Sequence, residues 1–95
     1  MDEKRLVRYL NSVGKECFVK YFRIFNDFNM SNSEIADIIE EENGYTRKAC
    51  NSRTGHARMI IREGGAKDAL EIIAASNRLS AEIVTEARNI INNFT

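Results

Sequence analysis

Between Asn43 and Arg62 the chain carries five basic residues and no acidic residue. In a helical conformation, several polar residues of this segment recur at steps of three or four and share one face. Arginine pairs with guanine, asparagine with adenine, and threonine with phosphate or the thymine methyl group. Such a face suits a helix in the major groove of DNA, although a solvated face without a partner has the same spacing. The predicted base contacts are Arg47, Asn51, Thr54 and Arg58, and the predicted backbone contacts are Lys48 and Arg62.

Arg53 lies on the other, apolar side of the same predicted helix, together with Ala49 and Ala57. A buried charge is costly unless it has a partner. We therefore expect Arg53 to bind an acid of the preceding helix or carbonyl groups at a helix end. Base contact by Arg53 is the alternative.

Two short motifs lie within residues 33–63. Ser33-Glu34-Ile35-Ala36 belongs to a first predicted helix, and Ser52-Arg53 followed by Ala57-Arg58 belongs to a second. Together they resemble a helix-turn-helix, similar to the promoter-reading last domain of bacterial sigma factors and to related regulator domains. The resemblance covers about a third of the chain. It implies that the second helix enters the major groove while the first crosses the DNA backbone.

The connection between these two helices departs from that family. Glu40–Thr46 makes it several residues longer than the tight turn of the family, and Cys50 occupies the position of the usual β-branched anchor. The resemblance implies that Cys50, Ala57 and Ile61 face inward.

Residues that could support catalysis or bind a metal are sparse. His56 is the only histidine, and Cys17 and Cys50 lack the CxxC spacing of zinc sites. Cys50 and His56 are separated by about 240° around a continuous helix, so their side chains point in different directions. Residues 64–68 lack the further glycines, the Lys-Ser/Thr pair and the preceding strand of a phosphate loop. We expect no enzyme, no cofactor and no metal site, with Cys50 in the core and His56 on the surface.

Apolar residues recur at steps of three or four along the whole chain, and no stretch alternates as a strand would. The sequence predicts an all-α fold, a compact bundle of about five helices that contains the helix-turn-helix. The helix after Thr46 is either continuous through Gly55 or restarts there. The predicted helices are a short one before Gly14, one near 13–28 whose four phenylalanines form the centre of the core, Glu34–Glu42 with a capping box from Ser31, one from Thr46 to about Glu63, Ala66–Ala75 and Ser80–Phe94.

The chain has 95 residues, with 14 Lys and Arg against 14 Asp and Glu, and 43% of its residues are hydrophobic. This length predicts a single domain over residues 1–95. The apolar content and zero net charge exclude an intrinsically disordered chain. No apolar run approaches the ~20 residues that span a bilayer. Because no signal peptide is visible and the chain has only two cysteines, we expect a cytoplasmic protein with reduced thiols.

Two functions fit these patterns. The leading hypothesis is sequence-specific binding of double-stranded DNA by a transcriptional regulator, with a homodimer through Ser80–Phe94 that doubles the contacts. The alternative is a helical protein–protein adaptor, or a modulator of a transcription complex, without direct DNA contact, because separated acidic and basic blocks suit charge-steered docking. A DNA reader needs a basic face free of acids. In an adaptor, Glu40–Glu42 neutralise that face or an exposed apolar groove borders it.

Overall fold

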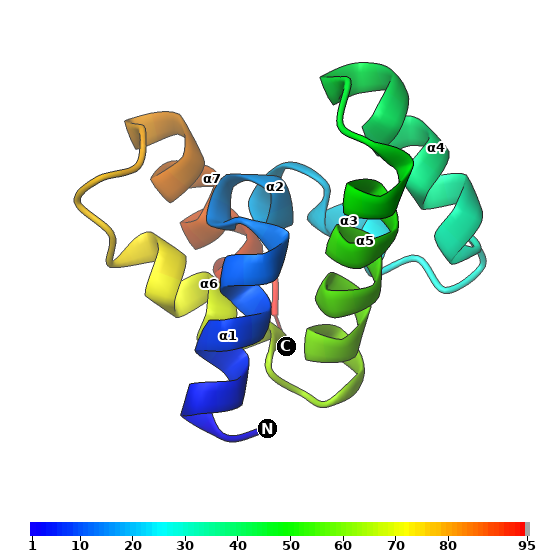
Figure 1. Cartoon of the computed structure of the whole chain (residues 1–95). Coiled ribbons are helices and arrows are strands. Elements are labelled where there is room, and N and C mark those ends of the chain that lie inside the picture. The colour runs from blue at the N-terminus through cyan, green and yellow to red at the C-terminus, as the bar shows by residue number, and fades with distance from the viewer. Residues whose placement is uncertain (95) are drawn as a thin grey trace.

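The computed structural model of the protein describes residues 1–94, which form seven helices and contain no strand. This confirms the all-α prediction. Figure 1 shows α1 beside α5, with α4 on the outer side of α5 and with α6 and α7 on the other side of α1. The helices are α1 (Glu3–Val13), α2 (Lys15–Lys20), α3 (Phe22–Phe25), α4 (Asn32–Asn43), α5 (Arg47–Arg62), α6 (Ala66–Ala74) and α7 (Ala81–Asn92).

The segment predicted as one helix near 13–28 forms two short helices instead. Gly14 ends α1 with a φ of 88°, a conformation that favours glycine. Tyr21 then separates α2 from α3, and its φ of −110° and ψ of 15° depart from helical values. Its hydroxyl lies 2.8 Å from both a Glu42 carboxylate oxygen and the Asn43 amide nitrogen. These contacts with the end of α4 hold Tyr21 and explain why local helix signals do not decide the backbone here.

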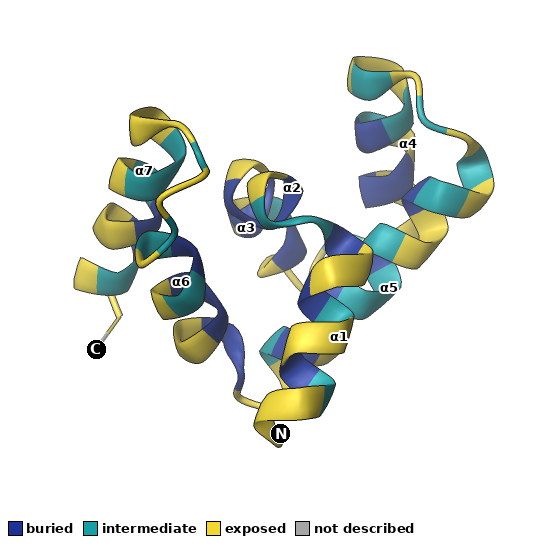
Figure 2. Ribbon diagram, turned by 60° about the vertical axis from the view of Figure 1, so that its left-hand side comes forward, coloured by how far each residue is buried: buried dark blue, intermediate teal, exposed yellow. Residues whose placement is uncertain are grey.

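The phenylalanines of this segment divide between core and surface. Phe18, Phe22 and Phe25 are buried, as predicted. Phe28 is 46% exposed, so its predicted place in the core is wrong. Figure 2 shows the buried residues on the sides of the helices that face one another. The core therefore lies between α1, α5 and the short helices α2 and α3, and it continues toward α6 and α7.

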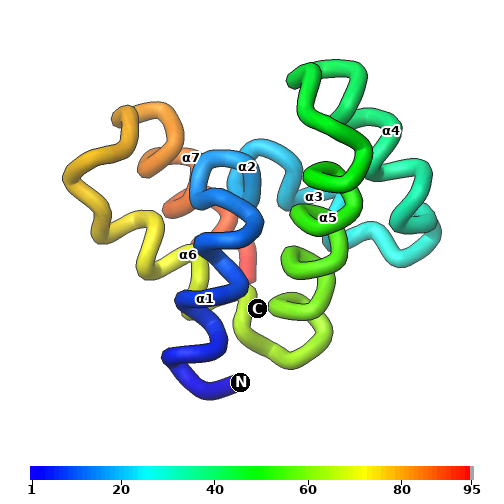
Figure 3. The backbone as a smooth tube through the Cα atoms, in the orientation of Figure 1, coloured from blue at the N-terminus to red at the C-terminus, as the bar shows by residue number. Residues whose placement is uncertain are grey.

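The predicted capping box at the start of α4 is confirmed. The Ser31 hydroxyl accepts a bond from the Glu34 amide at 3.1 Å, and the Glu34 carboxylate accepts one from the Ser31 amide at 3.0 Å. The helix continues through Asn43 and ends at Gly44, whose φ is 71°. Only Gly44–Thr46 then remain as the connection to α5, so the longer connection predicted from the sequence is wrong. The chain turns there and continues as α5, which packs against α4 (Figure 3).

The structure answers the open question about α5. Thr46 caps this helix by accepting a bond from the Ala49 amide at 3.1 Å. The helix then runs without a break through Gly55 to Arg62. Its 16 residues thus form one continuous helix, which packs between α1 and α4. Only residues on the sides that do not contact these helices can reach solvent.

Candidate nucleic-acid interface

The face of α5 that reaches solvent is rotated by about one residue from the face that carries the four predicted base contacts. Along this face Lys48, Ser52, Met59 and Arg62 are exposed and Gly55 is half-buried. Lys48, Gly55 and Met59 thus take the place of Arg47, Thr54 and Arg58 on this face, whereas Asn51 stays exposed beside Ser52. One residue corresponds to about 100° of rotation. The predicted stripe is therefore directed partly toward α4 and the core.

Arg58 is the clearest departure from prediction. Its side chain is only 3% exposed, so the expectation that it faces solvent to read bases is wrong. Its guanidinium donates to the carbonyl oxygens of Phe25 at 3.2 Å and Asp27 at 2.5 Å, and to the side-chain oxygen of Asn32 at 2.9 Å. It also lies 4.7 Å from the centre of the Phe28 ring. Burial lowers the pKa of Arg58, and the positive charge of Arg62 lowers it further. Arg58 fastens the loop between α3 and α4 to α5.

Thr54 is also buried, with no exposed surface, and its predicted base contact is not available in this conformation. Its hydroxyl oxygen has no hydrogen-bond partner among the described residues. A buried polar group without a partner costs about 1–3 kcal/mol. Thr54 therefore destabilises the fold through its oxygen while its methyl group fills the core.

Thr54→Val should raise the free energy of unfolding by about 1 kcal/mol, because it replaces the unpaired hydroxyl with a methyl group of similar shape. Urea unfolding at constant m-value measures this change. Thr54→Ser is the matched control: it keeps the hydroxyl and loses the methyl group, so it should be less stable than the wild type. A loss of stability in Thr54→Val would mean that the hydroxyl does have a partner.

Arg47 faces α4 rather than open solvent. Its guanidinium donates to the Asp37 carboxylate, to Glu40 at 3.3 Å and to the Ser33 hydroxyl at 3.0 Å. The hydrogen bond with Asp37 raises the pKa of Arg47. Its positive charge is thus neutralised by two carboxylates of the preceding helix. Arg47 is thus half-buried and paired with acids, and its predicted base contact stays a prediction.

The other three predicted residues do reach the surface. Lys48 and Asn51 are exposed on the first turns of α5, and Arg62 is exposed on its last turn. The Arg62 guanidinium lies 5.1 Å from the centre of the Phe28 ring. The structure therefore leaves one amide and two cations accessible on α5, at its two ends, and does not bring the six predicted residues together.

Arg53 behaves as the sequence predicts. Its guanidinium donates to the carbonyl oxygen of Val13, at the end of α1, at 2.6 Å. It also lies 4.1 Å from the centre of the Tyr45 ring. The confirmed arrangement is the one with carbonyl groups at a helix end, and it ties α5 to α1 directly beside Gly14.

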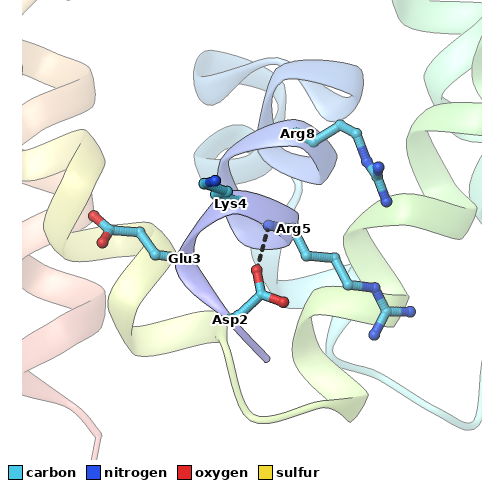
Figure 4. A pocket seen from close by; sticks show the side chains of 5 residues that line it. All are labelled: Asp2, Glu3, Lys4, Arg5 and Arg8. Atoms are coloured by element: carbon cyan, nitrogen blue, oxygen red, sulfur yellow. Dashed lines mark hydrogen bonds between the residues drawn. The ribbon is translucent and has the colours of Figure 1, made fainter.

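The contact between α1 and α5 creates surface features that sequence reasoning missed. The Tyr9 and His56 rings meet edge to face, with their centres 4.9 Å apart. Together with Gly55 and Met59 they border a shallow depression of about 300 Å³. Arg5 and Arg8 of α1 extend toward α5 (Figure 4). No local pattern reveals this site, because it depends on two helices about fifty residues apart in sequence.

The two cysteines are buried, as predicted for Cys50. Burial raises the pKa of both thiols, which keeps Cys17 and Cys50 protonated and weakly nucleophilic. Within residues 1–94 no group of three His, Cys, Asp or Glu side chains is placed to hold a metal ion. No helix of the described chain combines the length and the apolar content that crossing a membrane requires.

Comparison with known protein families, with curated proteins and with solved structures finds no match to this chain. The helix-turn-helix therefore stays a prediction. The three-residue connection Gly44–Thr46 has the length usual for that motif, but a connection of this length also joins other packed helix pairs.

Proposed function

We propose that the protein is a helical protein–protein adaptor and that α5 does not read DNA bases. The observation that carries this proposal is the charge exposed on the α4–α5 pair. Within residues 32–62 the only exposed basic residues are Lys48 and Arg62. The exposed acidic residues of the same segment are Glu34, Glu41 and Glu42, together with Asp37, which pairs with Arg47.

This surplus of acid opposes contact with a polyanion. Double-stranded DNA carries one negative charge per ~1.7 Å of its axis, and affinity depends largely on cations that neutralise phosphates. The sequence contains five basic residues in this region, but Arg53 and Arg58 bind backbone carbonyls and Arg47 is paired with acids. Three of the five basic residues of this segment thus bind groups of the chain itself, and only Arg58 among them is fully buried.

Two features support an adaptor. Asp37 and Glu40 neutralise Arg47, which is the charge compensation expected when the basic segment does not face DNA. In addition, a groove lined by apolar and acidic residues lies between α1 and α6. Exposed apolar surface beside charged groups is typical of protein-binding sites.

DNA binding is the second candidate function. Lys48, Asn51 and Arg62 remain exposed. In addition, Arg8 of α1 extends toward α5 (Figure 4). A nucleic acid would then contact the outer face of α5, with Gly55 allowing close approach, rather than the stripe predicted from the sequence.

Selection from a random pool of DNA duplexes, run beside selection from a random peptide library, separates the two candidates. We expect no enriched duplex sequence and a family of related peptides. Duplex affinity at low salt should be weak, and it should change little when Lys48 and Arg62 are both replaced by glutamine. An enriched duplex motif whose binding is lost in Lys48→Gln or Asn51→Ala would contradict the adaptor and establish DNA binding.

The homodimer through Ser80–Phe94 stays a prediction. Ala87 and Ile90 of its apolar stripe are already buried within the chain. Ile83, Val84 and Ile91 are half-buried and offer the remaining apolar surface of α7.

A further inference from the structure

A groove of about 450 Å³ is lined by residues of α1 and α6. Figure 1 shows α6 on the side of α1 opposite to α5. We call this depression the α1/α6 groove. Its apolar residues are Met1, Leu6, Ile72 and Ala75, and its acidic residues are Glu3, Asp68 and Glu71.

The groove residues of α6 share one face of that helix. Asp68, Glu71, Ile72 and Ala75 stand at positions i, i+3, i+4 and i+7. From the other side, Glu3 extends toward α6 (Figure 4). The groove is therefore lined by residues of both helices, and each side contributes both apolar residues and carboxylates. A depression of this form accepts the apolar side of a third helix.

Glu3 and Asp68 lie in the first turns of α1 and α6, where a negative charge stabilises a helix, and Glu71 lies further along α6. Glu3, Asp68 and Glu71 are exposed, and none forms an ion pair with another described residue. Arg5 and Arg8 of α1 extend toward α5 instead (Figure 4), so they do not neutralise the groove. The lining of the groove thus holds three carboxylates and no lysine or arginine side chain, beside apolar residues.

We infer that the α1/α6 groove binds a basic amphipathic helix of a partner protein. Its apolar side chains, spaced at three and four residues, would contact Leu6, Ile72 and Ala75, and its lysines or arginines would face the three carboxylates. This inference rests on the adaptor function proposed above and names the site and the partner class for it.

A synthetic helix of about five turns tests the inference. It carries leucines along one face and lysines elsewhere, and its affinity is measured by fluorescence anisotropy at low and moderate salt. One control peptide has the same composition without a helical leucine face, and another has glutamate in place of lysine. We expect the first peptide to bind at least about tenfold more tightly than either control, with an affinity that falls as salt increases.

Variants of the chain locate the site. The double substitution Glu3→Lys and Glu71→Lys should weaken binding by about tenfold. Glu41→Lys with Glu82→Lys is the matched control, because it makes the same charge change outside the groove. Like Glu3, Glu82 lies in the first turn of its helix. Affinity of the control should stay within about twofold of the wild type.

Filling the groove gives a second measurement. Ala75 is exposed at the end of α6, so Ala75→Trp should block the groove without burying a new group in the core. Unfolding curves of all variants establish that each is folded. NMR shifts on adding the peptide should concentrate at Leu6, Ile72 and Ala75.

The outcomes separate this inference from the adaptor proposal. If library peptides bind but their shifts lie on α4 or α5 and the Glu3/Glu71 variant binds normally, the groove assignment is wrong and the adaptor stands. If no peptide binds, both proposals fail. If the free protein is a dimer whose interface covers Ile72 and Ala75, a second copy occupies the groove and the inference is overturned.

Discussion

Replacing Arg58 with alanine should lower the free energy of unfolding by about 3 kcal/mol or more. The guanidinium supplies hydrogen bonds to two backbone carbonyls, of Phe25 and Asp27, and to the side chain of Asn32. Alanine removes all of these bonds and leaves a space beside the loop between α3 and α4. Urea unfolding followed by circular dichroism measures the loss.

Arg62→Ala is the matched control, because it removes the same side chain one turn later on the exposed face of α5. Its free energy of unfolding should stay within about 0.5 kcal/mol of the wild type. Arg58→Lys should recover only part of the lost stability, since an ammonium group cannot reproduce the planar fork of a guanidinium. Wild-type stability in Arg58→Ala would instead place Arg58 on the surface and restore the stripe predicted from the sequence.

The second large effect is expected at Gly14. Gly14→Ala should lower the free energy of unfolding by about 2–4 kcal/mol. Part of this cost is backbone strain of about 1–2 kcal/mol at the positive φ of 88°. The rest follows because a Cβ atom would lie 3.0 Å from the Arg53 guanidinium. Moving Arg53 weakens its bond to the Val13 carbonyl, which joins the end of α1 to α5.

A double-mutant cycle with Arg53→Met separates the two causes. If the clash is real, the cost of Gly14→Ala should be smaller in the Arg53→Met background, and only the strain should remain. Gly55→Ala is the control for a glycine without neighbours: nothing lies within 4 Å of a Cβ there, and alanine is favoured in a helix by about 1 kcal/mol. An equal cost of Gly14→Ala in both backgrounds would show that Arg53 does not contribute.

The ends of several helices could be predicted because the signals are local. Ser31 with Glu34, and Thr46, act on amides within one turn, and the structure uses each of them as the sequence indicates. Tyr21 shows where such signals stop. Its backbone conformation depends on contacts with Glu42 and Asn43, which lie more than twenty residues away.

The orientation of α5 could not be predicted in the same way. Its residues give the correct helix, but the side that reaches solvent depends on where α1 and α4 pack against it. A rotation by about one residue moves Thr54 and Arg58 from the surface into the core. Arginine is almost always exposed in proteins, so the residue type of Arg58 predicts exposure, whereas the side chain is buried. The position of Arg53 could be predicted, because a charge on the apolar side of a helix needs a partner inside the protein.

The two internal arginines also bear on the response of the protein to acid. Arg53 and Arg58 hold carbonyl and amide oxygens, and neither these oxygens nor a guanidinium gains or loses a proton in the acid range. Acidification therefore leaves the hydrogen bonds of Arg53 and Arg58 intact, and it weakens only those contacts that depend on an ionised carboxylate. Hydrogen bonds from Ser31 lower the pKa of Glu34, so its contribution to stability disappears as the pH falls through that lowered pKa. The capping box at the start of α4 should therefore be lost only at strongly acidic pH, while Arg53 and Arg58 still join α5 to the rest of the chain.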